Sequence, residues 1–267
     1  MPSARSPEEE AARLSAFVAR SGFHFEDKNT LIQALTHSSH PEKGKETGQF
    51  YLLGEKLLSL YAAEYVYARF PRIPATSLKT MVESYTGHKA LKDVAATFGV
   101  NKVMRWKGAG RDDRTGEGVA SARVLQALIG ALHQEKGAEA ARHFIHAHFL
   151  SRRIEPANHF TSDKPGRDLN FLQLSKGHPK PIPRLLAETG RDSNYSMFLV
   201  GYYSGLVKIS EGHGTSMKMA DFRAAMDGLR KHFLEEERDI KLPSDIDMGI
   251  REGRIAEGAV EGAVEEA

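Results

Sequence analysis

The sequence predicts an α+β protein, in which an all-α domain is followed by a small domain of the order α-β-β-β-α. Apolar residues recur every three to four positions through much of residues 8–150, which is the spacing of one helix face. Strand-like alternation is almost absent before residue 180. Two alternating stretches then follow at 197–203 and 206–210, and the Ser-Gly pair between them is a hairpin signal.

The first strong helix signal covers residues 48–70. Its apolar side chains follow one helix face: Leu53, Leu57, Leu60, Tyr61, Tyr65 and Phe70. Pro71 and Pro74 come directly after it, and proline cannot continue a helix. Four glycines are predicted to end helices in this part of the chain: Gly22, Gly87, Gly99 and Gly137.

The rest of the all-α part contains a polar loop and two more helices. Residues 105–118 are rich in Gly, Arg and Asp, which predicts a loop. Amphipathic helices are predicted at 119–134 and 138–150.

The residue pattern changes after residue 167 from helical spacing to strand-like alternation, which predicts a second domain. The pattern predicts a short helix (168–177), an extended stretch (183–189) and a hairpin (197–210). A Gly-rich loop (211–216) and a final helix (218–233) follow. The chain is therefore divided into an N-terminal helix or extension (1–19), an all-α domain (20–151), a linker (152–167), the α-β-β-β-α domain (168–234) and an acidic tail (235–267). Residues 239–267 of this tail are predicted to be largely disordered, with some helix as the alternative.

Composition excludes several functional classes. The chain has no cysteine, which excludes a disulfide framework, a zinc–thiolate site and a cysteine nucleophile. It has no run of about 18 apolar residues, so no transmembrane helix is expected. The N-terminus resembles neither a secretory signal nor an arginine-rich transit peptide.

Charge is unevenly placed along the chain. Residues 235–267 hold 11 acidic and 4 basic side chains, a net charge of −7, which leaves +9 on residues 1–234 out of the total of +2. A net positive charge on residues 1–234 favours a phosphate-bearing partner such as RNA. A solvated surface with an acidic solubility tail explains the same charges equally well.

Four sequence runs in order carry a resemblance to a known family. They are residues 31–39 (Leu-Ile-Gln-Ala-Leu-Thr-His-Ser-Ser), 51–58 (Tyr-Leu-Leu-Gly-Glu-Lys-Leu-Leu), the pairs at 70–71 and 78–79, and 122–131 (Ala-Arg-Val-Leu-Gln-Ala-Leu-Ile-Gly-Ala). Together they resemble the ribonuclease III domain, whose signature helix reads Glu-Phe-Leu-Gly-Asp and whose second acidic helix reads Ala-Asp-x-x-Glu-Ala-x-Ile-Gly-Ala. The resemblance implies an all-α endonuclease fold over roughly residues 20–150.

The family pattern has a clear chemical purpose. Carboxylates at positions i and i+4 share a face of one helix, and carboxylates at i and i+3 share a face of a second helix. Where the two faces meet, four carboxylates can hold divalent metal ions, which activate water and stabilise the leaving oxygen in phosphodiester hydrolysis.

This chain departs from the pattern at those four positions. The first, third and fourth carboxylates fall on Tyr51, Arg123 and Gln126, and only Glu55, at the second, is still acidic. One carboxylate facing an arginine cannot hold two magnesium ions, so the resemblance implies a degenerate site with no catalytic residue. Arg123 could instead pair with Glu55, and either could contact RNA.

No metal or other cofactor is expected. The thin candidate for a metal site is the group His143, His146 and His148. His143 and His146 are one helical turn apart, but His148 points elsewhere on a helix. A solvated or RNA-facing histidine cluster is the favoured interpretation.

Residues 168–234 resemble a double-stranded-RNA-binding domain. The match includes the Lys-Gly pair at 176–177, the run Phe-Leu-Val-Gly at 198–201, and the loop and helix start at 212–220. In that family, basic residues at the N-terminus of the final helix grip phosphates, helped by the helix dipole. Six residues are therefore candidates for RNA binding: Lys176, Lys180, Arg191, His213, Lys218 and Arg223.

Two departures in this domain predict weak duplex binding. Met217 stands where one lysine is expected, and the loop after residue 190 begins Arg191-Asp192, so a carboxylate opposes the arginine. A domain that serves in protein interaction is the alternative.

The chain keeps both folds but departs from the family patterns at both sites. In this it resembles the ribonuclease-III-like proteins of the mitochondrial large ribosomal subunit. The motifs are those at 70–74, 85–87, 126–132 and 198–203. The resemblance implies a structural ribosomal protein in the mitochondrion, although no transit peptide is visible. Its partners would be ribosomal RNA and large-subunit proteins, with a second ribonuclease-III-like subunit as heterodimer partner.

Two other functions are compatible with parts of the sequence. One is an accessory double-stranded-RNA-binding partner of an active ribonuclease III, which sequence cannot separate cleanly from the ribosomal role. The other is an active double-strand-specific endoribonuclease, which would need acidic residues in place of Tyr51, Arg123 and Gln126.

Overall fold

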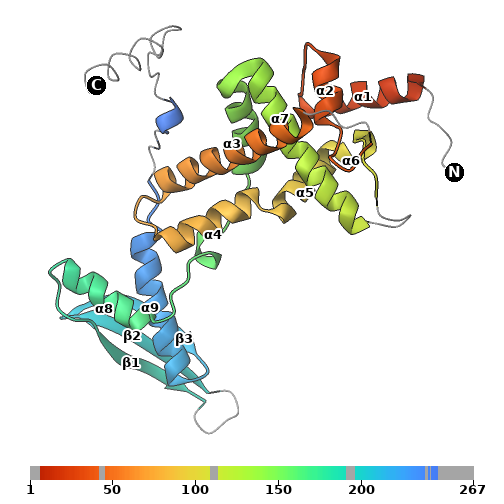
Figure 1. The fold of residues 1–267 in the computed structure, drawn as a ribbon. Coiled ribbons are helices and arrows are strands. Elements are labelled where there is room, and N and C mark those ends of the chain that lie inside the picture. Colours follow the sequence, from red (N-terminus) through yellow and green to blue (C-terminus); the bar gives the residue numbers. More distant parts are fainter. Residues whose placement is uncertain are drawn as a thin grey trace, which may run out of the picture.

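The computed structural model describes residues 7–41, 46–108, 114–190, 196–237, 240 and 242–245. In these residues the chain folds around two hydrophobic cores, one in an all-α part and one in an α-β-β-β-α part (Figure 1). The predicted fold class is confirmed in both parts. No helix within the described segments is long and apolar enough to cross a bilayer.

The all-α part consists of seven helices among the described residues. They are α1 (Pro7–Ser21), α2 (Lys28–Ala34), α3 (Glu46–Arg69), α4 (Ala75–Thr86), α5 (His88–Phe98), α6 (Val100–Val103) and α7 (Arg114–Ile145). α1 packs into the same core as the others, because its Phe17 is fully buried and stacks at 6.1 Å from the ring of Phe23.

α3 and α7 form the centre of the first core. They pack along much of their length, and Leu58 of α3 and Leu125, Leu128 and Ile129 of α7 are almost fully buried. The two helices predicted at 119–134 and 138–150 are both present within α7, and Gly137 separates them with non-helical angles (φ 85°, ψ 179°), as predicted for a glycine that ends a helix. A single π turn, His146–Leu150, continues α7.

The other predicted helix ends are reproduced with one difference. Gly22 and Gly99 have positive φ directly after α1 and α5, the conformation in which glycine caps a helix. Gly87 also ends α4, but in an extended conformation (φ −67°, ψ 165°), and its amide donates to the carbonyl of Glu83.

A connection with one short 3-10 turn (Pro156–Asn158) leads to the second part of the chain. It consists of α8 (Pro165–Ser175), β1 (Ile182–Thr189), β2 (Met197–Ser204), β3 (Val207–Gly214) and α9 (Met217–Phe233). The strands form one antiparallel sheet in the order β1-β2-β3. Val200 and Tyr202 of β2 are buried in the same core as Leu169 of α8 and Ala224 of α9.

The Gly-rich stretch predicted as a loop at 211–216 is mostly strand, so that prediction is wrong for residues 211–214. The glycines are needed for packing. A Cβ on Gly212 would lie 2.2 Å from the amide nitrogen of Ala224, and one on Gly214 would lie 2.7 Å from that of Ala220. β3 therefore lies directly against the backbone of α9, which only glycine permits.

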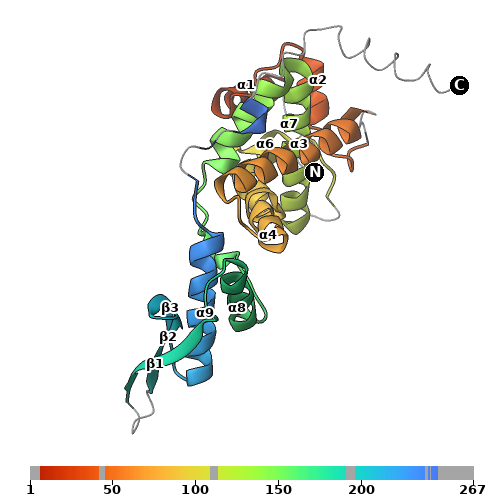
Figure 2. The same ribbon diagram turned by 90° about the vertical axis from the view of Figure 1, so that its left-hand side faces the viewer.

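The two parts of the chain meet at the end of α3. Figures 1 and 2 show α9 running from the sheet toward α3 and α4. Arg69 donates from Nε and Nη2 to Glu236 Oε2 (3.1 and 2.8 Å), and the amide of Glu237 donates to the carbonyl of Arg69. On the other side, the Ser84 hydroxyl lies 3.0 Å from Nδ1 of His159.

Part of the acidic tail is ordered against the all-α part. Leu242 is only 7% exposed, and the amide of Ser244 donates to Glu64 Oε1 at 2.5 Å. Within 239–267, the stretch predicted to be largely disordered, residues 240 and 242–245 are described, and Pro243–Asp245 form a 3-10 turn beside the buried Leu242. For residues 246–267 the prediction lies outside the described residues.

The degenerate carboxylate site and the candidate RNA-binding surface

Two close-packed helices carry the four positions that the sequence motifs align with the carboxylates of the family pattern. α3 carries Tyr51 and Glu55, and α7 carries Arg123 and Gln126. The helices approach so closely that a Cβ on Gly54 would lie 1.8 Å from the carbonyl oxygen of Gln126. The predicted meeting of the two helix faces is therefore confirmed.

Arg123 lies beside Tyr51, not beside an acid. Its Cζ is 5.9 Å from the centroid of the Tyr51 ring, within the range of a cation–π contact. Glu55 lies 3.7 Å from the Nζ of its neighbour Lys56, and no Glu55–Arg123 ion pair forms among the described residues. The pairing considered from the sequence is therefore wrong, and the tyrosine ring holds the guanidinium instead.

Gln126 is buried, with 8% of its surface exposed. Tyr51, Arg123 and Gln126 supply no carboxylate, and Glu55 supplies one. In the part of the chain that the structure describes, no three His, Asp or Glu side chains gather as a metal site would require. A two-metal site needs several oxygen ligands per ion, so these four positions do not fit one.

A cavity of about 240 Å³ opens beside Arg123 and Tyr51. The loop after α2, the first turns of α3, and α7 surround it. Its lining consists of Thr36, His37, Ser38, Thr47, Gly48, Tyr51, Arg123, Val124 and Ala127. None of these residues is acidic.

His37 contributes an imidazole to the wall of this cavity. Burial lowers its pKa, and the charge of Arg123 lowers it further. Its Nδ1 accepts the amide hydrogen of Ser39 at 3.2 Å and lies 3.0 Å from the Ser39 hydroxyl. The Nε2 atom is buried and has no hydrogen-bond partner among the described residues.

The histidine group of α7 and the π turn is dispersed among aromatic rings. The ring of His148 lies 4.6 Å from that of Phe144 and 4.9 Å from that of Phe98. His146 instead meets Tyr65, edge to face at 6.1 Å. Burial, and then the charge of His143, lowers the pKa of His148. These contacts are those of packed side chains.

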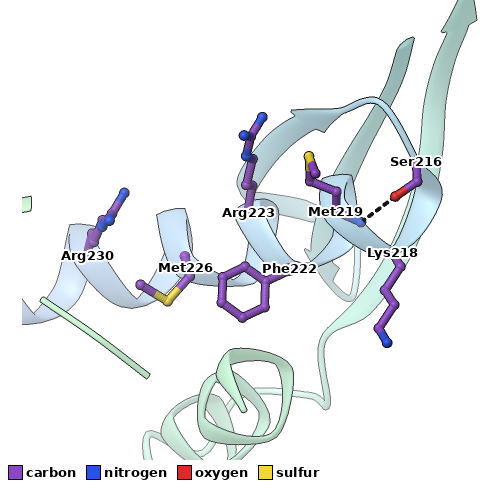
Figure 3. A pocket seen from close by; sticks show the side chains of 7 residues that line it. All are labelled: Ser216, Lys218, Met219, Phe222, Arg223, Met226 and Arg230. Carbon is purple, nitrogen blue, oxygen red and sulfur yellow. Dashed lines mark hydrogen bonds between the residues drawn. The ribbon is translucent and has the colours of Figure 1, made fainter. Parts of the chain in front are cut away.

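In the second part of the chain, α9 carries a groove of about 560 Å³. Figure 3 shows the seven side chains that line it: Ser216, Lys218, Met219, Phe222, Arg223, Met226 and Arg230. Ser216 caps the helix, accepting the amide hydrogen of Met219 at 3.2 Å. The groove therefore combines an apolar floor with three cationic side chains spread along α9, of which Lys218 lies at the helix N-terminus and Arg230 in the last turn.

Two of the six RNA-binding candidates, Lys218 and Arg223, line this groove, and a third lies beside it. Arg223 donates to the carbonyl oxygen of His213 at 3.0 Å, so β3 and α9 bring these residues together. Lys218 lies at the start of α9, where the helix dipole favours an anion. Asp221 follows within the same turn and accepts the Tyr202 hydroxyl at 2.9 Å.

The other candidates lie apart. Nζ of Lys176 is 3.0 Å from Nδ1 of His232, near the far end of α9, which places it about 20 Å from Lys218 along the helix. Lys180 is exposed before β1. Arg191 lies outside the described residues. The sequence reasoning missed Met219, Phe222, Met226 and Arg230, although their spacing of three to four along a helix with a basic face was a usable signal.

Comparison with known proteins identifies both parts. Residues 27–153 match the family model Ribonuclease-III-like, and residues 160–253 match the MRPL44 dsRNA-binding domain. Ribonuclease 3 of Desulforamulus reducens is 30% identical over 231 residues, covering 84% of this chain and 92% of that protein. The chain belongs to the ribonuclease III family.

Relatives in this family carry two different names. The large ribosomal subunit protein mL44 of Neurospora crassa is 38% identical over 136 residues, which are 51% of this chain and 31% of that protein. The chain thus spans less than a third of the length of that relative. The nuclease domain of ribonuclease III from Campylobacter jejuni superposes on 51% of this chain, with 24% identity and a TM-score of 0.45.

Proposed function

We propose that this chain is a non-catalytic, RNA-binding constituent of the large subunit of the mitochondrial ribosome. The match to the MRPL44 dsRNA-binding domain and the 38% identity to a large-subunit protein support the ribosomal assignment. The observation that carries the non-catalytic part is the contact between Arg123 and Tyr51 at two of the four carboxylate positions.

The chemistry of phosphodiester hydrolysis explains why this contact matters. The family reaction needs divalent cations held by carboxylates, because the metal activates water and stabilises the leaving oxygen. A guanidinium at the third position repels such cations, and a tyrosine ring occupies the space beside it. Glu55 alone cannot replace the lost ligands.

Contact with RNA is assigned to the basic residues around the start of α9. Lys218, Arg223 and His213 lie together there, and the helix N-terminus adds its dipole. Asp221 opposes this charge within the same turn, which favours a modest affinity for isolated duplexes. Binding would then depend on the whole assembly.

A second ribonuclease-III-like subunit is the proposed partner. The exposed side of α3 carries Leu52, Leu60 and Tyr67, which are 54%, 59% and 61% exposed. Their spacing places them along one stripe of the helix, and exposed apolar stripes of this kind are typical of protein interfaces.

The decisive experiment is sucrose-gradient sedimentation of native extracts from purified mitochondria and from cytosol, with detection of this chain. We expect co-migration with the mitochondrial large subunit that resists moderate salt. A light, cytosolic, salt-labile species would refute the ribosomal assignment.

The second candidate function is an accessory partner of an active ribonuclease III. It is favoured by the relatives named ribonuclease 3 that align along both domains, one of them over 84% of this chain. The same gradients separate the two functions. An accessory partner would co-purify with nuclease activity on duplex RNA and would be absent from the large subunit.

A further inference from the structure

The cavity beside Arg123 lacks the carboxylates that a cation site requires. Its nine lining residues include one guanidinium, one imidazole and four hydroxyl-bearing side chains, and no acid. In the family pattern, two of these positions, Tyr51 and Arg123, hold carboxylates. The sign of the charge at this place is therefore reversed.

Arg123 has no acidic partner within the described segments. Glu55 is engaged by Lys56, and among the described residues the guanidinium lies over the face of Tyr51, with no ion pair to an acid. A cation–π contact holds the guanidinium in place without neutralising its charge. An exposed, oriented arginine with free donors is the side chain most used to bind phosphate groups.

His37 supplies a second unmet donor in the same wall. The hydroxyl of Ser39 accepts the amide hydrogen of Lys107 at 3.0 Å, so its own hydrogen can point to Nδ1 of His37. With the amide of Ser39 also directed at Nδ1, the proton of the neutral ring lies on Nε2. That atom is buried without an acceptor, which is costly unless a ligand or a small shift of the ring satisfies it.

The segment next to this loop adds further positive charge. The amide of His37 donates to the carbonyl of Arg105 at 2.8 Å, and Lys107 follows two residues later. The cavity thus lies in a basic neighbourhood. At about 240 Å³ it is smaller than the sites that hold drug-sized molecules, and it has room for one small anionic group.

We propose that this cavity is a phosphate-binding site, in which Arg123 and His37 hold an anionic group where the family pattern places metal-binding carboxylates. The phosphate can belong to an RNA strand or be a free phosphate ion. That the phosphate comes from RNA rests on the proposed function. Binding of a phosphate group by Arg123 and His37 does not depend on it.

The test uses the full chain in phosphate-free buffer at constant ionic strength. Inorganic phosphate is titrated while the histidine ring resonances are followed by NMR, with the resonance of His37 assigned from a His37→Gln variant. We expect the His37 signal to shift in a saturable way. Arg123→Gln should weaken this binding about tenfold, the usual effect of removing a charged hydrogen-bond donor.

A matched control comes from an exposed arginine outside the cavity. Arg13→Gln on α1 removes the same charge and should leave the titration unchanged. A His37 signal that does not respond to phosphate, or an Arg123→Gln variant that binds like the unmodified chain, would overturn the proposal.

RNA duplexes identify the source of the phosphate. Binding of 5′-phosphorylated and 5′-hydroxyl duplexes is compared for the unmodified chain and for Arg123→Gln. A loss with both duplexes assigns the site to an internal phosphodiester, a loss with the phosphorylated duplex alone assigns it to a terminal phosphate, and no loss assigns it to the free ion. Co-sedimentation with the large subunit is measured in a separate experiment. If the ribosomal assignment fails, the phosphate-binding measurement can still be interpreted.

Discussion

Gly54 of α3 and Gly130 of α7 face each other at the point where the two helices cross. A Cβ on Gly130 would lie 2.0 Å from the carbonyl oxygen of Phe50 and 3.0 Å from the amide nitrogen of Gly54. A Cβ on Gly54 would lie 2.9 Å from the amide nitrogen of Gly130. The two helices therefore touch backbone to backbone, and any side chain at either position would separate them.

Gly130→Ala is expected to destabilise the fold by about 3 kcal/mol, because overpacking here meets rigid backbone atoms. The free energy of unfolding, measured by urea denaturation, tests this. Gly48→Ala is the control, since Gly48 lies on α3, the helix that faces Gly130, and a Cβ there has nothing within 4 Å. It should be neutral or slightly stabilising, because alanine favours helix. Equal stability of the two variants would show that the helices can separate without cost.

Restoring the four acids tests whether only the ligands were lost. The variant Tyr51→Glu, Glu55→Asp, Arg123→Asp, Gln126→Glu removes the repelling guanidinium and supplies four carboxylates on the facing helices. We expect magnesium to raise its melting temperature, because the ion binds only the folded site, and no such shift in the unmodified chain. Cleavage of duplex RNA is measured in parallel. If the variant folds but does not bind magnesium, the relative position of α3 and α7 no longer allows the four carboxylates to hold the ion.

Lys218→Glu should weaken RNA binding, and the loss should be larger at low salt, because phosphate contacts release counterions. The affinity for a short RNA duplex is measured across a salt series. Lys89→Glu, an exposed lysine on α5, makes the same charge change in the other part of the chain. A similar loss for both variants would indicate an effect of net charge, with no specific contact at the start of α9.

The ion pair between Arg69 and Glu236 is predicted to hold the two parts of the chain together. Its stability contribution is small, at most about 1 kcal/mol, because both side chains are partly exposed. Arg69→Glu should nevertheless loosen the contact, seen as a larger radius of gyration in small-angle scattering. Arg69→Glu combined with Glu236→Arg should restore the compact form. A compact single variant would assign the contact to the backbone bond of Glu237 and to the packing of Leu242.

His148 predicts a stability loss in mild acid. Burial lowers its pKa in the folded chain, so between pH 7 and 5 the unfolded chain binds more protons than the folded one. Stability from this group is therefore present above its unfolded pKa and is lost as the pH falls through it. His148→Phe, which fits among Phe98 and Phe144, should reduce the slope of melting temperature against pH. An unchanged slope would assign the acid sensitivity to other groups.

The sequence predicted the elements whose signals are local. The helices and the hairpin at Ser204-Gly205 follow from spacing and turn residues. It missed features that depend on contacts between distant segments. Gly212 and Gly214 have the composition of a loop, although they form the surface on which α9 packs.

The same limit explains the errors at the candidate site. Opposite charges at Glu55 and Arg123 suggested a pair, but which neighbour an exposed arginine meets depends on rotamers and on how far apart the helices lie. The tail was judged by its charge, and its buried Leu242 carries no local signal of its own. Lys176 and Lys218 share a family motif, but α9 holds them at opposite ends.

After α9 the chain comes back to α3, so the two parts are joined at two places. One is the connection before α8, and the other is formed by the contacts of Glu236, Glu237 and Ser244 with α3. A body on a single tether can swivel in all directions, whereas a body fastened at two points can only rock about the line that joins them. The groove on α9 and the crossing of α3 and α7 therefore keep a nearly constant separation. The second attachment therefore restricts how far the sheet and α9 can rotate relative to the all-α part.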